Sequence, residues 1–531
     1  MVADTGRAVD RSISAMSDDV TLYDEIEGYV SQLSAAPGEI IDLHVSTPHD
    51  SFDIRIERWG AERTLVLAEN GIAGMRYDAP ENADSHGCDW PASWQVAVDS
   101  GWRSGFYLLT MTVEGAAPGR DVAHAGFVVR SGSTQSNALL VLGTNTWNAY
   151  NTWGGTSLYT GGHQVSFRRP WPRGLLCRPQ VERDDRKARP VYTGEEPDAD
   201  GEIFQAYRLA NGYTPAIGST GWFTHERRFV EWAEAAGYEF DYAVSSDFDA
   251  DPALLDGYEV VMGVGHDEYW TKAGRDQVDN HIGGGGDYVS LSGNTMFWQV
   301  RLVDSSGEPG LDHLIGHKYG GHSRDPVVAG GDAAEMSGLW CDPLVARPEW
   351  STLGAGSVFG LYHRFGQATP RGTGGFTVFR SDHWMMADTG LRYGDLLGAD
   401  QGVVGYETLG CPIALDDLQL PVVRSGHGLP EEHEIVGLAL SSNLGVGEYP
   451  KSISALNDQG DLEFLAQRYY GSTSPENLAK VRHGNAVMVV CRPQGKSGGE
   501  VVTIGSTDWV FGLADNALVS QVTRNILDRF L

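Results

Sequence analysis

The chain has 531 residues, too many for one ordinary domain and enough to bury a large hydrophobic core. Its 39 basic and 71 acidic residues give a formal net charge of −32, which would repel nucleic-acid backbones and anionic lipid. We therefore expect neither nucleic acid nor a membrane as a partner, and we interpret the acidity as a feature of the surface that favours solubility.

Cysteine usage and the amino-terminal sequence indicate where the protein works. Five cysteines are far apart, odd in number and free of any CxxC spacing, which favours reduced thiols over a disulfide framework. The first twenty residues contain no apolar stretch typical of a signal peptide, and no membrane-spanning run of apolar residues occurs. We expect a soluble, cytoplasmic protein.

The first quarter of the chain has the pattern of short strands. Residues 1–36 are polar and rich in small residues, and we expect an amino-terminal arm there. Residues 37–131 contain short alternating segments such as IIDLHVS and FDIRIERW, separated by turn-rich stretches. Several short strands at this spacing predict a small β-sandwich of the immunoglobulin-like type.

The pattern from residue 137 to residue 531 is that of an α/β domain with loop-rich insertions at about 300–430. Continuous apolar runs alternate with amphipathic stretches, which predicts a mostly parallel sheet with right-handed crossovers. The expected elements are strand 138–144, helix 225–236, strand 238–244, a short helix at 252–255, strand 260–263, helix 272–282 and strand 287–291. Strands HEIVGLALSS, GNAVMVVCR and EVVTIGST and a closing amphipathic helix follow near the end of the chain.

Polar and aromatic side chains follow three of the predicted strands. TNTWNAYNTWGGTSLY, over 144–159, contributes Tyr150 and Tyr159, and GHDEYW contributes His266 and Glu268. SGNTMFW places Asn294 at an equivalent strand end. Because the carboxyl ends of parallel strands lie along one edge of a sheet, we expect these side chains to converge there.

Two further residues are weaker candidates, and a structural interpretation stays open for the whole set. Lys318 lies in HLIGHKYGGHSRDP, and Glu407 lies in GVVGYETLG. The polar residues after the predicted strand 260–263 could instead cap the next helix, with Asp267 or Thr271 as the N-cap. No cysteine has the neighbours of a nucleophile elbow, and the serine match at Ser497 lies in a turn between two strands, which argues against a covalent mechanism.

The remaining residue types are compatible with a metal site. Phenolate and carboxylate oxygens are hard anionic donors, and two phenolates with one carboxylate would neutralise a trivalent iron. A tyrosine ligates only if the metal draws off its proton. Aromatic residues at strand ends also serve packing, and this alternative stays open.

The same motifs carry a family resemblance. TWNAYNTWGGTSLY, GHDEYW, SGNTMFW, GYE, GSTDWVFGL and TRNIL resemble the large-subunit catalytic region of the N,N-dimethylformamidase family, over roughly residues 135–531. The resemblance implies a sheet similar to that of class I glutamine amidotransferases, without their cysteine. It also implies a mononuclear iron, Fe³⁺, held by two tyrosines and one glutamate, with zinc as the less favoured metal.

The family's site residues are carried over position by position. Glu268 matches the carboxylate ligand and Tyr150 the first tyrosine, while Tyr159 is the candidate for the second, with Tyr192 and Tyr207 as alternatives. The polar residues that match the surroundings of the metal are His266, Asn294, Lys318 and Glu407.

We therefore predict a metal-dependent amidohydrolase that cleaves the C–N bond of a small, N-alkylated amide such as a formamide. Glu407 or His266 would act as general base, and Asn294 would stabilise the oxyanion. The alternatives are hydrolysis of a urea or cyclic amide, or a carbohydrate- or polymer-binding protein. In the latter the stacking platform would consist of Trp147, Tyr150, Trp153 and Tyr159.

Assembly is predicted only in outline. We expect a homo-oligomer. The family's large subunits carry a lectin-like domain and bind a small subunit, whereas this chain shows only the short β-sandwich, so the need for a separate small subunit stays open.

Overall fold

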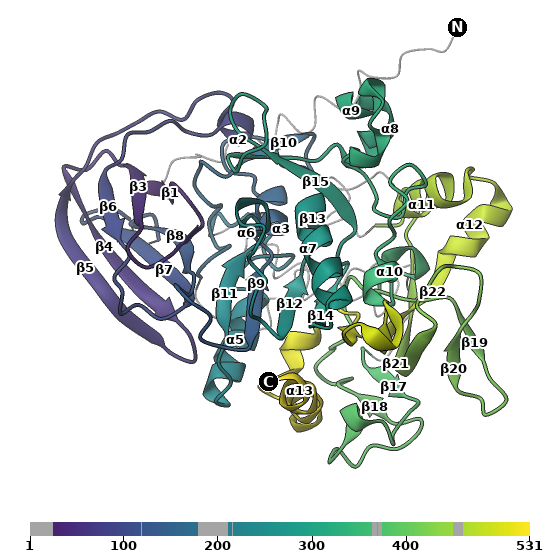
Figure 1. Cartoon of the computed structure of the whole chain (residues 1–531). Helices are drawn as coiled ribbons and strands as arrows, with labels where there is room; N and C mark the ends of the chain where they lie inside the picture. Colours follow the sequence, from purple (N-terminus) through teal and green to yellow (C-terminus); the bar gives the residue numbers. More distant parts are fainter. Residues whose placement is uncertain are drawn as a thin grey trace, which may run out of the picture.

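The computed structural model describes residues 25–117, 119–178, 211–214, 216–363, 369, 374–449 and 460–531. A unit of two β-sheets lies beside a larger body built on a nine-stranded sheet (Figure 1). No helix within these ranges combines the length and the apolar character that crossing a bilayer requires.

The amino-terminal unit consists of a three-stranded sheet, order β1-β3-β6, and a five-stranded sheet, order β2-β8-β7-β4-β5. Alternate side chains of both sheets, such as Leu43 of β3 and Ile54 of β4, are fully buried in one shared core. The strands are β1 Glu27–Val30, β2 Ser34–Ala35, β3 Ile40–Ser46, β4 Ser51–Trp59, β5 Arg63–Ala73, β6 Trp94–Ala97, β7 Gly105–Thr112 and β8 Val122–Val129, with helix α2 at Ala83–His86.

The predicted boundary between arm and sheets at residue 36 is wrong. Strand β1 pairs antiparallel with β3, and the two-residue β2 pairs parallel with β8, so the sheets begin at Glu27. Both strands are too short to show a two-residue alternation, which is why the sequence pattern does not reveal them. The immunoglobulin-like class of this unit stays a prediction.

The nine-stranded sheet has the order β11-β9-β12-β14-β23-β22-β21-β17-β18. Strands β11 to β23 in this order pair in parallel, and the remaining pairs are antiparallel. The expected mostly parallel sheet is therefore a mixed one, and its likeness to glutamine amidotransferases stays a prediction. The strands are β9 Ala138–Leu142, β11 Asp241–Val244, β12 Val260–His266, β14 Asp287–Gly293, β17 Phe376–Val378, β18 Leu396–Leu397, β21 Glu432–Ser442, β22 His483–Arg492 and β23 Val501–Ile504.

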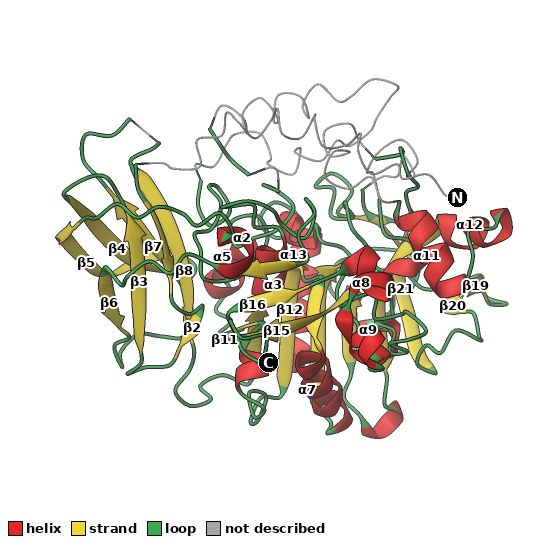
Figure 2. Cartoon of the chain, turned by 90° about the horizontal axis from the view of Figure 1, so that it is seen from above, coloured by secondary structure: helices red, strands yellow, loops and turns green. Residues whose placement is uncertain are grey.

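Helices cover both faces of this sheet, which explains its continuous apolar strands. In β9, Leu140 and Leu142 join the core under α5 and α13, while Leu139 and Val141 join the core under α6 and α7. Figure 2 shows α7 on one side of the strands and α5 and α13 on the other. These helices are α5 Glu226–Ala235, α6 Asp247–Ala250, α7 Lys272–Gly283 and α13 Ala517–Phe530.

Most predicted elements around the central strands are confirmed. Helix α7 begins after Thr271, whose hydroxyl accepts a hydrogen bond from the Gly274 amide at 3.1 Å, so Thr271 is the N-cap. The short helix expected at 252–255 is wrong. The helical turn is α6, and Pro252 follows it instead of starting a helix.

Segments that connect the strands of the large sheet form a second sheet at the carboxyl ends of the central strands. A four-stranded sheet has the order β10-β16-β15-β13, and its apolar side chains pack against α11. Its strands are β10 Gln164–Ser166, β13 Tyr269–Thr271, β15 Trp298–Val303 and β16 His313–Ile315. The other elements are α3 Thr144–Ala149, α8 Gly321–Arg324, α9 Pro326–Gly330, α10 Trp350–Leu353, α11 Asp461–Tyr470, α12 Pro475–Arg482, a hairpin of β19 Ile413–Leu415 and β20 Pro421–Val423, and the 3₁₀ turn η2 Lys318–Gly320.

Candidate active site

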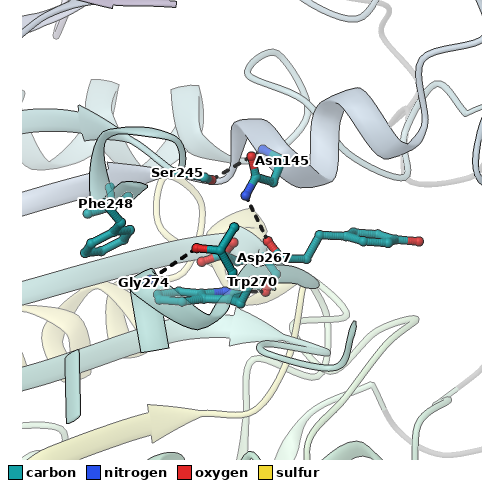
Figure 3. A pocket seen from close by; sticks show the side chains of 9 residues that line it. Asn145, Ser245, Phe248, Asp267, Trp270 and Gly274 are labelled. Atoms are coloured by element: carbon teal, nitrogen blue, oxygen red, sulfur yellow. Dashed lines mark hydrogen bonds between the residues drawn. The ribbon is translucent and has the colours of Figure 1, made fainter. Parts of the chain in front are cut away.

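The end of β12 places two of three consecutive ionisable side chains in one site. His266 is the last residue of the strand, and Glu268 follows two positions later on the same side. Asp267 points the other way and lines a small separate pocket with Asn145, where burial raises the pKa of its carboxyl to about 7 (Figure 3). The alternation of an extended chain therefore divides the triplet between two environments.

Glu268 is the point at which the site converges. Its Oε2 accepts hydrogen bonds from the hydroxyls of Tyr159 at 2.6 Å and Tyr150 at 3.3 Å. Its Oε1 accepts one from the indole nitrogen of Trp298 at 2.7 Å. The two tyrosine rings stack with centroids 4.1 Å apart, so both phenol oxygens face one carboxylate that is only 3% exposed.

His266 joins Glu268 to a second carboxylate. Its Nε2 lies 2.7 Å from Glu407 Oε2 and 3.4 Å from Glu268 Oε2. Its Nδ1 lies 2.8 Å from the carbonyl oxygen of Ser219, which can only accept, so Nδ1 carries a proton. Nε2 is therefore the nitrogen that faces both carboxylates.

Asn294 and Glu407 meet where the end of β14 approaches the segment between β18 and β19, which carries Glu407. The Asn294 side-chain nitrogen donates to Glu407 Oε2 at 3.1 Å, and its oxygen accepts from the Ser357 hydroxyl at 2.7 Å. The approach requires Gly293, because a Cβ there would lie 2.2 Å from the Glu407 carbonyl oxygen. The amide of Asn294 is thereby fixed in orientation.

Lys318 brings an ammonium group into the cluster. Its Nζ lies 3.2 Å from the centroid of the Tyr159 ring, and the residue is 5% exposed. Its backbone has a φ of 49°, a conformation that is uncommon for a residue other than glycine. A buried ammonium on an aromatic face is stabilised by the ring's quadrupole.

Burial and neighbouring charges set the protonation states. Burial lowers the pKa of His266, but Glu407 and Glu268 outweigh it and raise that pKa to about 10. Burial lowers the pKa of Lys318 to about 8, against the opposing charge of Glu268. Burial, with the charge of Glu268, holds the pKa of both Tyr150 and Tyr159 well above the ordinary value. Protein groups alone therefore leave the two phenols protonated.

The structure brings all the predicted site residues into this one cluster. They are Tyr150, Tyr159, His266, Glu268, Asn294, Lys318 and Glu407. The alternative ligands Tyr192 and Tyr207 lie outside the described residues. Within the described ranges, one group of histidine and acidic side chains has ligand atoms within 4.8 Å of one another, namely His266, Glu268 and Glu407.

Sequence reasoning missed two contacts and proposed one surface that does not exist. Trp298, the last residue of SGNTMFW, bonds to Glu268, and the Tyr406 hydroxyl lies 3.5 Å from His266 Nδ1. Trp298 lies in the motif SGNTMFW and Tyr406 in the motif GYE, so these motifs were the sequence signal that could have identified them. The aromatic stacking platform is wrong, because Trp147 and Trp153 are only 2% and 5% exposed.

Fold and site together define an α/β protein with phenol, carboxylate and imidazole groups gathered at its central strand ends. The model of the family described as N,N-dimethylformamidase beta subunit-like, C-terminal, matches residues 54–523, and the chain belongs to this family. The match begins within β4, so the family likeness extends well before residue 135, where the motif resemblance started.

Two curated relatives align with part of the chain. The N,N-dimethylformamidase beta subunit of Alcaligenes sp is 24% identical over 224 residues, which are 40% of this chain and 28% of the relative. The beta subunit of the same name from Paracoccus aminophilus is 22% identical over 224 residues, with the same shares. The alignments thus span less than a third of either relative.

Proposed function

We propose that this chain is a metal-dependent amide hydrolase that cleaves the C–N bond of small N-alkylated amides such as formamides. The observation that carries the proposal is the convergence of two tyrosine hydroxyls and a histidine nitrogen on the buried carboxylate of Glu268, with the carboxylate of Glu407 beside the same histidine nitrogen. Family membership and the names of the relatives support the reaction class.

The donor set fits a hard trivalent metal. Tyr150, Tyr159 and Glu268 would hold a mononuclear iron, since their oxygens already meet within hydrogen-bond distance and would carry three negative charges together. Zinc, with its preference for nitrogen and sulfur, fits two phenol oxygens less well. When bound, the metal supplies Lewis-acid chemistry and lowers the pKa of a nearby water.

The remaining residues have distinct parts in the hydrolysis. Glu407 accepts the proton of the attacking water and returns it to the leaving amine, and His266 Nε2, 2.7 Å away, balances the charge of that carboxylate. The Asn294 side-chain amide is held by Ser357 and donates toward the developing oxyanion. Lys318 keeps Tyr159 in place and offsets the negative charge around Glu268.

The assembly and location of the protein stay proposals as well. Both relatives are named beta subunits, which supports a complex of this chain with a second kind of chain. We also propose a homo-oligomeric, cytoplasmic enzyme.

Two measurements on the purified full chain test the proposal. Elemental analysis is expected to find about one iron per chain, with a visible absorption band of the tyrosinate-to-iron charge-transfer type. Amine release from N,N-dimethylformamide is expected to exceed release from urea and from a cyclic amide of similar size. A protein that is free of metal as isolated and inactive after iron is supplied contradicts the proposal; faster turnover of urea redirects it to another C–N bond.

A further inference from the structure

The two tyrosines are joined by a stretch without a helix or strand, and a single buried arginine holds it from one side. We call residues 150–159 the tyrosine segment. The guanidinium of Arg169 donates to the carbonyl oxygens of Trp153 at 2.5 Å, Asn151 at 3.0 Å and Ser166 at 3.1 Å. Arg169 is 1% exposed, so one cation ties this stretch to β10 from within the protein.

The amino-terminal unit holds the same segment from the other side. Asp84 Oδ2 accepts hydrogen bonds from both the amide and the hydroxyl of Thr156, each at 2.6 Å. Gly155 permits this approach, because it has a φ of +148° and a Cβ there would lie 2.6 Å from Asp84 Oδ2. The rings of Trp90 and Trp153 meet edge-on at 5.9 Å.

Hydrogen bonds of Thr156, Ser157 and Thr160 connect Asp84 to Tyr159. The Ser157 amide donates to the Thr160 hydroxyl at 2.8 Å, and the Tyr159 amide donates to the Ser157 hydroxyl at 3.2 Å. These local bonds make a compact turn whose start is anchored by Asp84 and whose end presents the Tyr159 hydroxyl to Glu268. A displacement of Thr156 would therefore move Tyr159.

We propose that Asp84 is a positioning residue of the active site, which acts through Thr156 to keep the tyrosine hydroxyls at Glu268. The inference rests on the proposed function for its effect on turnover. It makes the amino-terminal unit part of the machinery that shapes the site, because a side chain of that unit fixes the segment that carries both candidate ligands.

The first experiment measures the order of the tyrosine segment in the full chain. In Asp84→Ala, hydrogen–deuterium exchange of residues 151–160 is expected to be about 10- to 100-fold faster, the effect of losing charge-assisted hydrogen bonds. Asp84→Asn keeps an oxygen that can accept both bonds and is expected to stay close to the wild type. The matched control is Asp99→Ala, because Asp99 accepts a bond from the Gly101 amide within the unit's own turn.

The second experiment separates positioning from general stability. In Asp84→Ala, kcat for amine release is expected to fall about 10- to 100-fold with little change in KM, and the visible iron band to weaken, because ligand geometry is disturbed. Asp84→Asn is expected to restore both. If Asp84→Ala does not fold by circular dichroism, Thr156→Val, which loses only the hydroxyl bond, takes its place with an expected effect of about 3- to 10-fold.

Each outcome decides the question. Exchange and turnover equal to the wild type in Asp84→Ala, or in Thr156→Val where that variant replaces it, overturn the proposal. So does an Asp99→Ala variant that loses as much as Asp84→Ala. If the wild type holds no iron and hydrolyses no amide, the proposed function fails, and the exchange comparison alone still shows whether Asp84 holds the tyrosine segment.

Discussion

The site is built from two regions that are held in different ways. We call His266, Glu268, Asn294 and Glu407 the strand-end group. The first three lie at the ends of β12 and β14, and the carbonyl oxygen of Glu407 accepts a hydrogen bond from the Thr507 amide just after β23. We call Tyr150, Tyr159 and Lys318 the loop group, because side-chain contacts and turns hold them. The sheet fixes the first group through main-chain ladders, whereas a few polar side chains fix the second.

This difference predicts how each group responds to substitution. A ladder of backbone hydrogen bonds survives the loss of one side chain, so a change in the strand-end group alters the chemistry and leaves its neighbours in place. A loop held by a few charge-assisted bonds moves when one is lost.

The largest effect is expected for Glu268→Ala. Both tyrosine hydroxyls and His266 Nε2 face this carboxylate, so its removal is expected to abolish iron binding and lower turnover at least about 10³-fold. Elemental analysis and amine release measure both. Glu239→Ala is the control, since Glu239 pairs with Arg103 on the surface. A Glu268→Ala protein that keeps its iron and its activity would show that the two groups do not share Glu268 as a metal ligand.

A smaller effect is expected for Asn294→Ala in the strand-end group. Loss of one oxyanion donor is expected to lower kcat about 10²- to 10³-fold. Iron content is expected to stay at the wild-type level, because Asn294 contacts Glu407 and Ser357 and not the candidate ligands. Loss of the metal together with activity would contradict the independence of the strand-end side chains.

The strand-end group was largely predictable from the sequence, and the loop group only in part. The apolar runs of β12 and β14 leave few choices for where a strand ends, and this alone assigns His266, Glu268 and Asn294 to one edge of the sheet. Tyr159 emerged as a candidate from its motif, because no periodicity reports on a turn.

Other features had no local sequence signal at all. The contact between Asp84 and Thr156 joins residues 72 positions apart through side chains, and α2, which carries Asp84, has only four residues. The antiparallel half of the large sheet was missed for a similar reason. An apolar strand such as β22 has the same pattern in either direction, and only its register with β21 and β23 shows which one it takes.

For Lys318→Met, in the loop group, we expect a smaller loss of turnover than for the two substitutions above. The methionine keeps most of the length of the side chain but removes the cation over the Tyr159 ring, and turnover is expected to fall about 3- to 30-fold. The melting temperature is expected to fall, because the buried carboxylate of Glu268 loses an opposing charge. Lys272→Met is the control, since that ammonium is exposed and pairs with Asp276. An unchanged kcat in Lys318→Met would show that the ammonium group does not contribute to the reaction.

The smallest effect on catalysis is expected for Glu349→Gln, a support of the strand-end group. Glu349 Oε1 accepts the Ser357 amide at 3.0 Å, and Ser357 in turn holds Asn294. The amide oxygen of glutamine can accept the same bond. We therefore expect kcat near pH 7 to stay within about threefold of the wild type, in contrast to Asp84→Ala in the support of the loop group.

Stability, in contrast, is expected to change with pH. Burial raises the pKa of Glu349 from 4.5 to about 7, so between these values the folded protein holds a proton that the unfolded chain has released. The contribution of the Glu349 carboxyl to the free energy of unfolding is complete below pH 4.5 and is lost as the pH rises to about 7. The free energy of unfolding of the wild type minus that of Glu349→Gln should therefore fall by up to about 3 kcal/mol across this window and level off above it. Urea unfolding at several pH values measures the difference, and a difference that is constant or rises with pH would mean that Glu349 is ionised in the folded protein.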